Sequence, residues 1–112
     1  MTNYKQGDLV TLYYPFDDFS DEKIRPAVIV GKSRSKVGTY IVVKVTTTLR
    51  QDANSFLLRN EFLSLPTRKM SEARCNEIIT ISESRLIRRV STLDKSQVEK
   101  LCLKIQQNFT VD

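Results

Sequence analysis

A chain of 112 residues, 40% of them hydrophobic, can bury one compact core but not two, so we expect a single domain over residues 1–112 with its core at about 6–109. The formal charge of +5 favours a polyanionic partner such as nucleic acid. Histidine is absent, which excludes imidazole ligands to a metal and the Ser-His and Cys-His nucleophile pairs.

The expected location follows from the absence of long apolar runs. No stretch approaches the roughly 18 apolar residues that cross a bilayer, and the start, MTNYKQGD, lacks the apolar segment of a secretion signal. We therefore expect a cytoplasmic protein with no membrane partner. A reducing cytosol would keep Cys75 and Cys102 as free thiols.

The first half of the chain favours β-structure. Residues 7–14 open with a turn and continue as a strand-prone run that Pro15 ends. A polar loop follows, and residues 25–31 then predict a second strand, with Pro26 tolerated at the strand's first residues or on an edge. Residues 31–38 are typical of a hairpin connection. The densest β-branched run, 40–48, predicts a central strand buried on both faces.

The second half adds short strands and ends in a helix. Residues 55–59 and 74–81 are strand-prone and are separated by the turn-rich segment 66–69. Five short strands with little helix between them indicate a closed or half-closed barrel.

Near the C-terminus the hydrophobic period becomes helical. Asp94 and Gln97 form the pattern of a capping box at the helix start. The apolar stripe predicted for this amphipathic helix consists of Val98, Leu101, Cys102, Ile105 and Phe109.

Three early segments occur in a distinctive order. Gly7-Asp8-Leu9-Val10 leads to Tyr14-Pro15-Phe16, Arg25-Pro26-Ala27-Val28-Ile29-Val30 follows, and the central strand ends in Lys44-Val45-Thr46-Thr47. In this order and spacing the segments resemble the MazF/PemK (Kid) family of toxin endoribonucleases. Residues 71–81, 84–86 and 89–101 resemble the family's fifth strand, short helix and closing helix.

The resemblance implies a mainly β fold, a small SH3-like β-barrel of the CcdB/Kid/MazF type with a C-terminal amphipathic helix. It also implies a homodimer that cleaves single-stranded RNA, messenger RNA above all, at preferred short sequences and without a cofactor or metal. A small acidic antitoxin would be the second partner, its disordered tail occupying the RNA groove.

RNA can be cut by its own 2′-hydroxyl if an enzyme takes the proton and stabilises the charge on the phosphate. The resemblance marks Arg25 as catalytic, and a guanidinium can bind two phosphate oxygens at once. From residue type alone, Arg25 is more readily interpreted as a strand-end cation that is solvated or paired with Asp21 or Glu22. The resemblance also marks Thr46, although threonine is common in strands simply because it fits.

Arg74 matches an arginine that the Kid-like branch uses in catalysis, but the next motif position departs from that branch. Asn76 stands where Kid-like toxins carry an aspartate, and an amide cannot accept a proton at neutral pH. Either Glu77, which strand alternation places on the opposite face, or a loop acid such as Asp21 or Glu22 would then remove the proton.

Several further residues are candidates for contact with RNA. Strand alternation would place Thr46 and Thr48 on the same face, and Phe56 either stacks on a base or packs in the core. The full set of RNA-binding candidates is Phe16, Lys44, Thr47, Thr48, Phe56, Asn76 and Glu77.

Two other functions are compatible with the same barrel. One is a protein-binding gyrase poison resembling CcdB, and the other is a catalytically weak module that binds RNA or an antitoxin, for which Asn76 is the reason.

Overall fold

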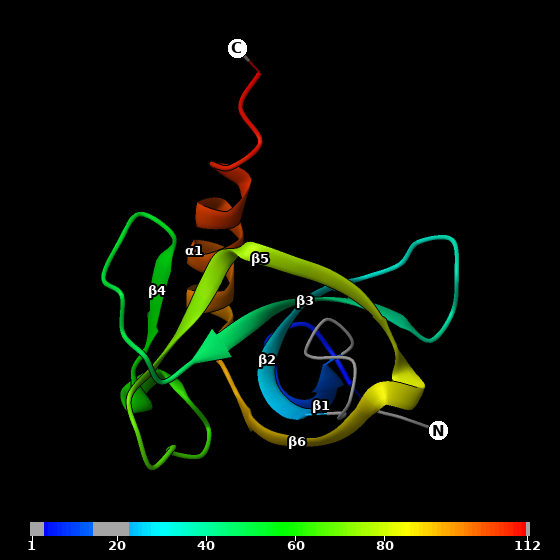
Figure 1. The fold of residues 1–112 in the computed structure, drawn as a ribbon, viewed down its shortest axis with the longest axis horizontal. Helices are drawn as coiled ribbons and strands as arrows, with labels where there is room; N and C mark the ends of the chain where they lie inside the picture. The colour runs from blue at the N-terminus through cyan, green and yellow to red at the C-terminus, as the bar shows by residue number, and fades with distance from the viewer. Residues whose placement is uncertain (1–3, 15–22, 112) are drawn as a thin grey trace.

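The computed structural model describes residues 4–14 and 23–111. Within these residues the chain forms one six-stranded antiparallel sheet, in the order β4-β5-β3-β2-β1-β6, and one C-terminal helix (Figure 1). The strands are β1 Asp8–Tyr14, β2 Lys23–Lys32, β3 Thr39–Thr46, β4 Ser55–Leu58, β5 Ser71–Ser82 and β6 Leu86–Thr92; the helix α1 is Lys95–Gln106; two 3₁₀ turns are η1 Asn60–Phe62 and η2 Glu83–Arg85.

The mainly β fold class with a C-terminal helix is confirmed, although the sheet is not closed. The edge strands β4 and β6 do not pair with each other. Instead, the segment after β4 runs beside the end of β6, where Leu63 forms an isolated bridge with Leu93 and the Ser64 N–H donates to the Thr92 carbonyl oxygen at 2.9 Å. The barrel is therefore half-closed by one loop.

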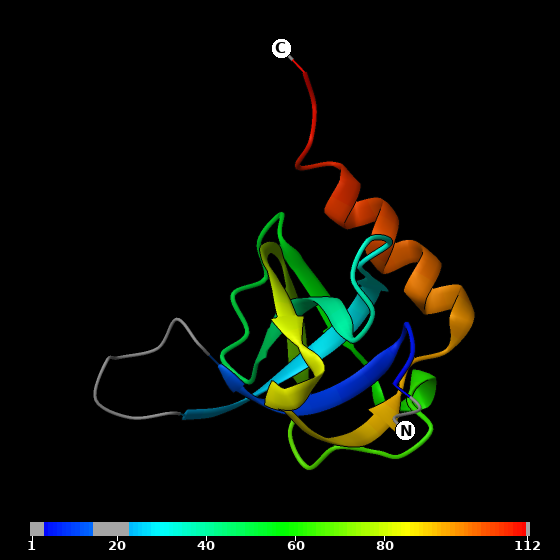
Figure 2. The ribbon, with the colours of Figure 1, turned by 90° about the vertical axis from the view of Figure 1, so that its right-hand side faces the viewer.

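Hydrophobic residues cover both faces of the curled sheet. On one face, Leu9, Val28 and Val43 pack with Leu101 of α1, and Figure 2 shows the helix lying on that one side of the strands. On the other face a second cluster includes Val10 and Val42. Because Val42 and Val43 are adjacent and both fully buried, the middle of β3 is covered on both faces, as the run of β-branched residues predicts.

The helix follows the predicted period but not the predicted ends. Val98, Leu101 and Ile105 are buried, whereas Phe109 is 67% exposed and lies beyond the helix, so its place in the apolar stripe was wrong. Asp94 is the N-cap residue, but its side chain makes no capping hydrogen bond. The N–H of Gln97 bonds to the backbone oxygen of Asp94 instead, so the predicted capping box does not form.

Strand β6 is the element that the pattern missed. It overlaps residues 89–101, which resemble a closing helix, and the helix begins only at Lys95. Exposed Arg88 and Arg89 interrupt the hydrophobic alternation, and two register shifts against β1 break the period of two. An edge strand of this kind carries too few buried residues to be recognised from hydrophobicity.

The other strands differ from prediction mainly at their ends. β5 begins at Ser71 rather than Arg74, and β3 ends at Thr46 rather than Thr48. Pro26 lies inside β2, opposite Thr11 of β1. Pairing with β3 starts only at the next residue, Ala27, so the proline occupies a part of β2 that is effectively an edge.

Packing of α1 against the sheet predicts a contrast between two leucines of the helix. Leu101→Ala empties a fully buried position and should lower the free energy of unfolding by about 2–5 kcal/mol. Leu103→Ala, at a position 61% exposed, should change it by less than about 0.5 kcal/mol. Urea unfolding followed by circular dichroism measures both, and equal losses would contradict this packing.

Candidate functional site

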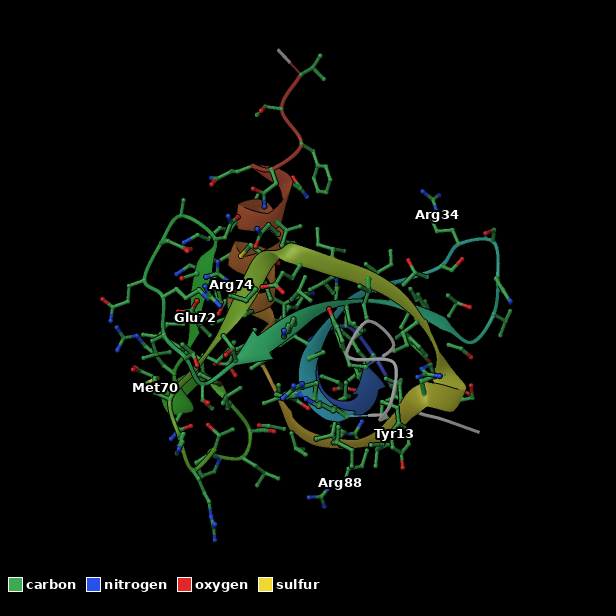
Figure 3. All side chains as sticks on the ribbon, viewed as in Figure 1. Tyr13, Arg34, Met70, Glu72, Arg74 and Arg88 are labelled. Atoms are coloured by element: carbon green, nitrogen blue, oxygen red, sulfur yellow. The ribbon has the colours of Figure 1, made fainter. Side chains whose placement is uncertain are left out.

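The polar residues of interest extend along the sheet face that carries the second hydrophobic cluster. Tyr14 belongs to that cluster. Lys44 lies two residues beyond Val42 on β3, and alternation along the strand sets both on this face. Figure 3 shows Arg74 and Glu72 between β4 and β5 at the same end of the sheet. We call this end of the sheet face, which carries Lys44, Glu72 and Arg74, the polar end.

Arg25 and Thr46 come from adjacent strands. The last paired residues of β2 and β3 at this end are Ala27 and Lys44, so Arg25 and Thr46 each lie two residues beyond the pairing. Both follow the period of two from buried residues of the second cluster, so both belong to the polar end. The Thr46 Oγ1 accepts a hydrogen bond from the Thr48 N–H at 3.0 Å, which orients the hydroxyl and leaves its proton available.

Lys44 and Glu77 form a loose ion pair beside an aromatic ring. The Lys44 Nζ lies 3.8 Å from the Glu77 Oε1 and 5.5 Å from the centre of the Tyr14 ring. The side chains of Lys44 and Glu77 are 29% and 40% exposed. A pair at this distance and exposure is stabilised only weakly, so either partner can be exchanged for another charged group.

Arg74, by contrast, is held tightly and is 6% exposed. Its Nη1 and Nη2 donate to the two carboxylate oxygens of Asp52, each at 3.0 Å. Nη1 also donates to the Glu72 Oε2 at 2.6 Å. The buried Nε has no hydrogen-bond partner among the described residues; it faces the Glu77 Oε2 at 3.6 Å.

Glu72 is the fully buried centre of this network and lies opposite Thr46 across β3 and β5. Its Oε1 accepts the backbone N–H groups of Arg50 and Gln51, and its Oε2 accepts the Ser55 hydroxyl at 2.7 Å. Gln51 has a positive φ of 52°, a left-handed conformation that a non-glycine residue holds only when its surroundings impose it. Glu72 therefore fastens the loop between β3 and β4.

The pKa values follow from these contacts. The hydrogen bond from Arg74 is the main reason why the pKa of Asp52 falls from 3.8 to about 2. Burial raises the pKa of Glu72, but the hydrogen bonds from Ser55, Arg74 and the loop backbone outweigh burial and lower it overall. The hydrogen bond to Asp52 is also the main reason why the pKa of Arg74 is raised. All three groups therefore stay charged at neutral pH.

The register shift in β5 corrects the expected position of Glu77. Val43 lies opposite Ile78, but Val45 lies opposite Ala73, so β5 carries extra residues between these pairs. Simple alternation along β5 predicts that Glu77 lies on the sheet face opposite to Arg74, and this prediction was wrong. The irregularity brings its carboxylate to the same side as Arg74 and Lys44.

Other sequence candidates lie elsewhere. Phe56 packs against the hydrophobic cluster under α1, which is the core alternative for this residue. Asn76 is exposed. β3 ends at Thr46, so the alternation expected to carry Thr48 to the same face does not extend that far. Thr47 lines a pocket whose apolar walls, Leu9 and Val45, belong to the cluster on the other sheet face.

Three candidates, Phe16, Asp21 and Glu22, lie outside the described residues. Two functional-looking residues were missed by sequence reasoning, namely Asp52 and Glu72. The alternation of Glu72 with Arg74 on one strand is a signal for a same-face ion pair. Asp52 accepts from the Asn54 N–H two residues on, which is the Asx-turn pattern, but its reach to Arg74 is not visible in the sequence.

The fold is a half-closed β-sheet with one terminal helix, and its candidate site is a set of paired charges at one end of the sheet. The family model that describes a PemK-like, MazF-like toxin of type II toxin-antitoxin systems matches residues 5–109. The chain belongs to this family. No curated protein matches the chain. None of the helices in residues 4–14 and 23–111 is both long and apolar enough to span a bilayer.

Solved structures share the fold at low sequence identity. The Mycobacterium tuberculosis toxin MazF-mt6 is 23% identical, with a TM-score of 0.71 over 94% of this chain and 98% of that one. A mycobacterial endoribonuclease in complex with its cognate antitoxin is 13% identical, with a TM-score of 0.71 over 98% and 100% of the two chains. MazF in a MazE-MazF complex from Deinococcus radiodurans is 14% identical, with a TM-score of 0.74 over 94% of each chain.

Acid should unfold the protein partly through the Glu72 network. Because the folded pKa values of Asp52 and Glu72 are lowered, their stabilisation is complete above the usual values of 3.8 and 4.5 and is lost as the pH falls through the lowered values, which for Asp52 is about 2. Asp52→Asn should be less stable than wild type at neutral pH, with a flatter decline below pH 3.8. Urea unfolding at stepped pH measures this, and parallel declines would contradict it.

Proposed function

We propose that this chain is a metal-independent endoribonuclease toxin that cuts single-stranded RNA by attack of the RNA 2′-hydroxyl, leaving a 2′,3′-cyclic phosphate. The proposal is supported by the pairing of Lys44 with Glu77 and by the ends of the neighbouring strands β2 and β3, which carry Arg25 and Thr46 just beyond the Ala27–Lys44 pair. Membership of the MazF-like family supports the same reaction class.

The proposed roles follow from charge and position. Arg25 and the Thr46 hydroxyl stabilise the non-bridging phosphate oxygens as negative charge develops. The Glu77 carboxylate takes the proton from the 2′-hydroxyl as the new O2′–P bond forms and the P–O5′ bond breaks. Lys44, released from its loose pair with Glu77 by the incoming phosphate, donates a proton to the departing 5′-oxygen.

Arg74 receives an indirect role in this proposal. Its two terminal nitrogens are engaged by Asp52 and Glu72, so a phosphate would have to displace buried charge-assisted hydrogen bonds to reach them. Its Nε is directed at Glu77, 3.6 Å away. Arg74 then positions the general base and fixes the loop after Thr46, and its predicted catalytic role stays a prediction.

The proposed partners are a second copy of the chain and a small acidic antitoxin in the cytoplasm. Exposed Ile24, Leu65 and Met70 provide apolar surface for association. The antitoxin is supported by its presence in the mycobacterial and Deinococcus radiodurans complexes, whose toxins share this fold.

Arg25 provides the direct test of the nuclease. Purified protein should cut single-stranded RNA in EDTA, and Arg25→Ala should lower the rate by about a hundredfold or more because the guanidinium stabilises the transition state. Arg25→Lys keeps the charge but not the two-pronged contact and should recover only part of the rate.

The matched control for Arg25 is Arg34→Ala, on the hairpin far from the polar end, which should cut like wild type (Figure 3). Mapping of the RNA ends reads out the chemistry. Intact RNA after long incubation, or growth arrest with intact transcripts, would reject the nuclease and favour a protein-directed poison.

Glu77 is tested by separating its charge from its shape. Glu77→Gln should lower kcat by about a hundredfold to ten-thousandfold and flatten the acidic limb of the pH–rate profile, because the amide cannot accept the proton. Glu99→Gln, on an exposed position of α1, is the matched control and should keep the wild-type profile. An unchanged acidic limb in Glu77→Gln would assign the base elsewhere.

A further inference from the structure

A pocket opens on the opposite side of the same strand ends that carry Arg25 and Thr46. It has a volume of about 300 Å³, and its apolar walls are Leu9, Pro26, Val45 and Val90. Pro26 directly follows Arg25, and Thr47, at the rim, directly follows Thr46. Because its walls Leu9 and Val45 belong to the hydrophobic cluster on the other sheet face, the pocket lies on the opposite side of these strand ends from the polar end.

The rim of this pocket is cationic. Arg68 and Lys69 lie on it with Thr47, Thr67 and Ser71, and the pocket lining contains no acidic residue among the described part of the chain. Neither cation forms an ion pair with any residue in 4–14 or 23–111 that the structure describes, and both are exposed. Apolar walls under an unneutralised cationic rim fit a ligand that combines a flat apolar body with a negative group.

The loop that carries the two cations is held in place before any ligand arrives. The Asn60 Oδ1 accepts the Thr67 N–H at 2.9 Å, and the Thr67 Oγ1 donates to the Lys69 carbonyl oxygen at 3.0 Å. At the other end of the loop, the Ser91 hydroxyl donates to the Leu65 carbonyl oxygen at 2.7 Å and accepts the Leu65 N–H. A fixed wall reduces the entropy that binding would otherwise cost.

We infer that this pocket receives one unpaired base of the RNA strand next to the cut, with the phosphate of that nucleotide against Arg68 and Lys69. The inference rests on the proposed nuclease function and names a specificity-determining subsite for it. The pocket and the polar end lie on the two sides of the same strand ends, so an RNA strand that bends around these ends can occupy both. A volume near the lower limit of ligand pockets suits one base rather than several.

The first experiment measures binding rather than cleavage. A seven-nucleotide RNA that spans the mapped cut is made uncleavable by a 2′-deoxyribose, and single abasic positions are scanned through it by fluorescence anisotropy. One abasic position should weaken binding to the wild type about tenfold. In the variant Thr47→Phe the new side chain fills the pocket from its exposed rim. The same abasic position should then cause no further loss of affinity, while abasic sites at the other positions should weaken binding as they do in the wild type.

An abasic penalty that is the same in wild type and in Thr47→Phe would overturn the inference. It would also be overturned if Thr47→Phe weakened only the binding of an acidic antitoxin peptide, since the occupant would then be a protein segment. If the wild type binds RNA without cutting it, the titration uses heptauridine, so failure of the nuclease and failure of the subsite are read separately. Thr47→Phe should then weaken heptauridine binding several-fold, and unchanged affinity would overturn the subsite.

A second pair of variants keeps the test valid if Thr47→Phe folds poorly. Arg68→Ala with Lys69→Ala should lower the slope of log affinity against log salt by about 0.7 for each phosphate that the protein no longer neutralises. The matched control removes Arg34 and Lys36 from the hairpin between β2 and β3. Figure 3 places Arg34 and Met70, which follows the rim loop, on opposite sides of the molecule. Equal falls in slope in both double variants would reduce Arg68 and Lys69 to general charge and overturn the subsite.

Discussion

The arrangement of the polar end depends on one buried carboxylate, that of Glu72. A charge without access to water is costly unless hydrogen bonds replace the lost solvation. Glu72 receives them from Arg74, from Ser55 on β4 and from two backbone N–H groups in the loop after β3. These donors come from separate parts of the chain, so their common acceptor holds the loop against the strand end that carries Thr46.

This network also decides which charges remain for an RNA phosphate. Arg74 is enclosed and is paired closely with the carboxylates of Asp52 and Glu72, whereas the partner of Lys44 within the described residues is the more distant and partly exposed Glu77. A phosphate can therefore compete for Lys44 at much lower cost than for Arg74. The same competition would free the Glu77 carboxylate when a substrate arrives, which links binding to the appearance of a base in the proposed mechanism.

The sequence predicted the parts of the fold that depend on local pattern. The β-branched run of β3 and the helical spacing of Val98, Leu101 and Ile105 are such patterns, and the motif order identified the family. What it could not predict depends on pairing between distant segments. The position of Glu77 follows from a register shift between β3 and β5, and the hydrogen bonds of Asp52 to Arg74 join residues 22 positions apart. Neither leaves a periodic trace in the hydrophobic pattern.

Strand ends explain why one short stretch of sequence can serve two purposes. Arg25 and Pro26 are consecutive on β2, and the pleat sends them to opposite faces, whereas Thr47 directly follows the last residue of β3, Thr46, and lines the pocket on the other face. On one face Arg25 and Thr46 join the polar groups proposed for phosphate chemistry, and on the other Pro26 and Thr47 line the apolar pocket. The register of β2 with β3, which begins at Ala27 and Lys44, governs where both strand ends lie, and a change in that register would move the polar end and the pocket together.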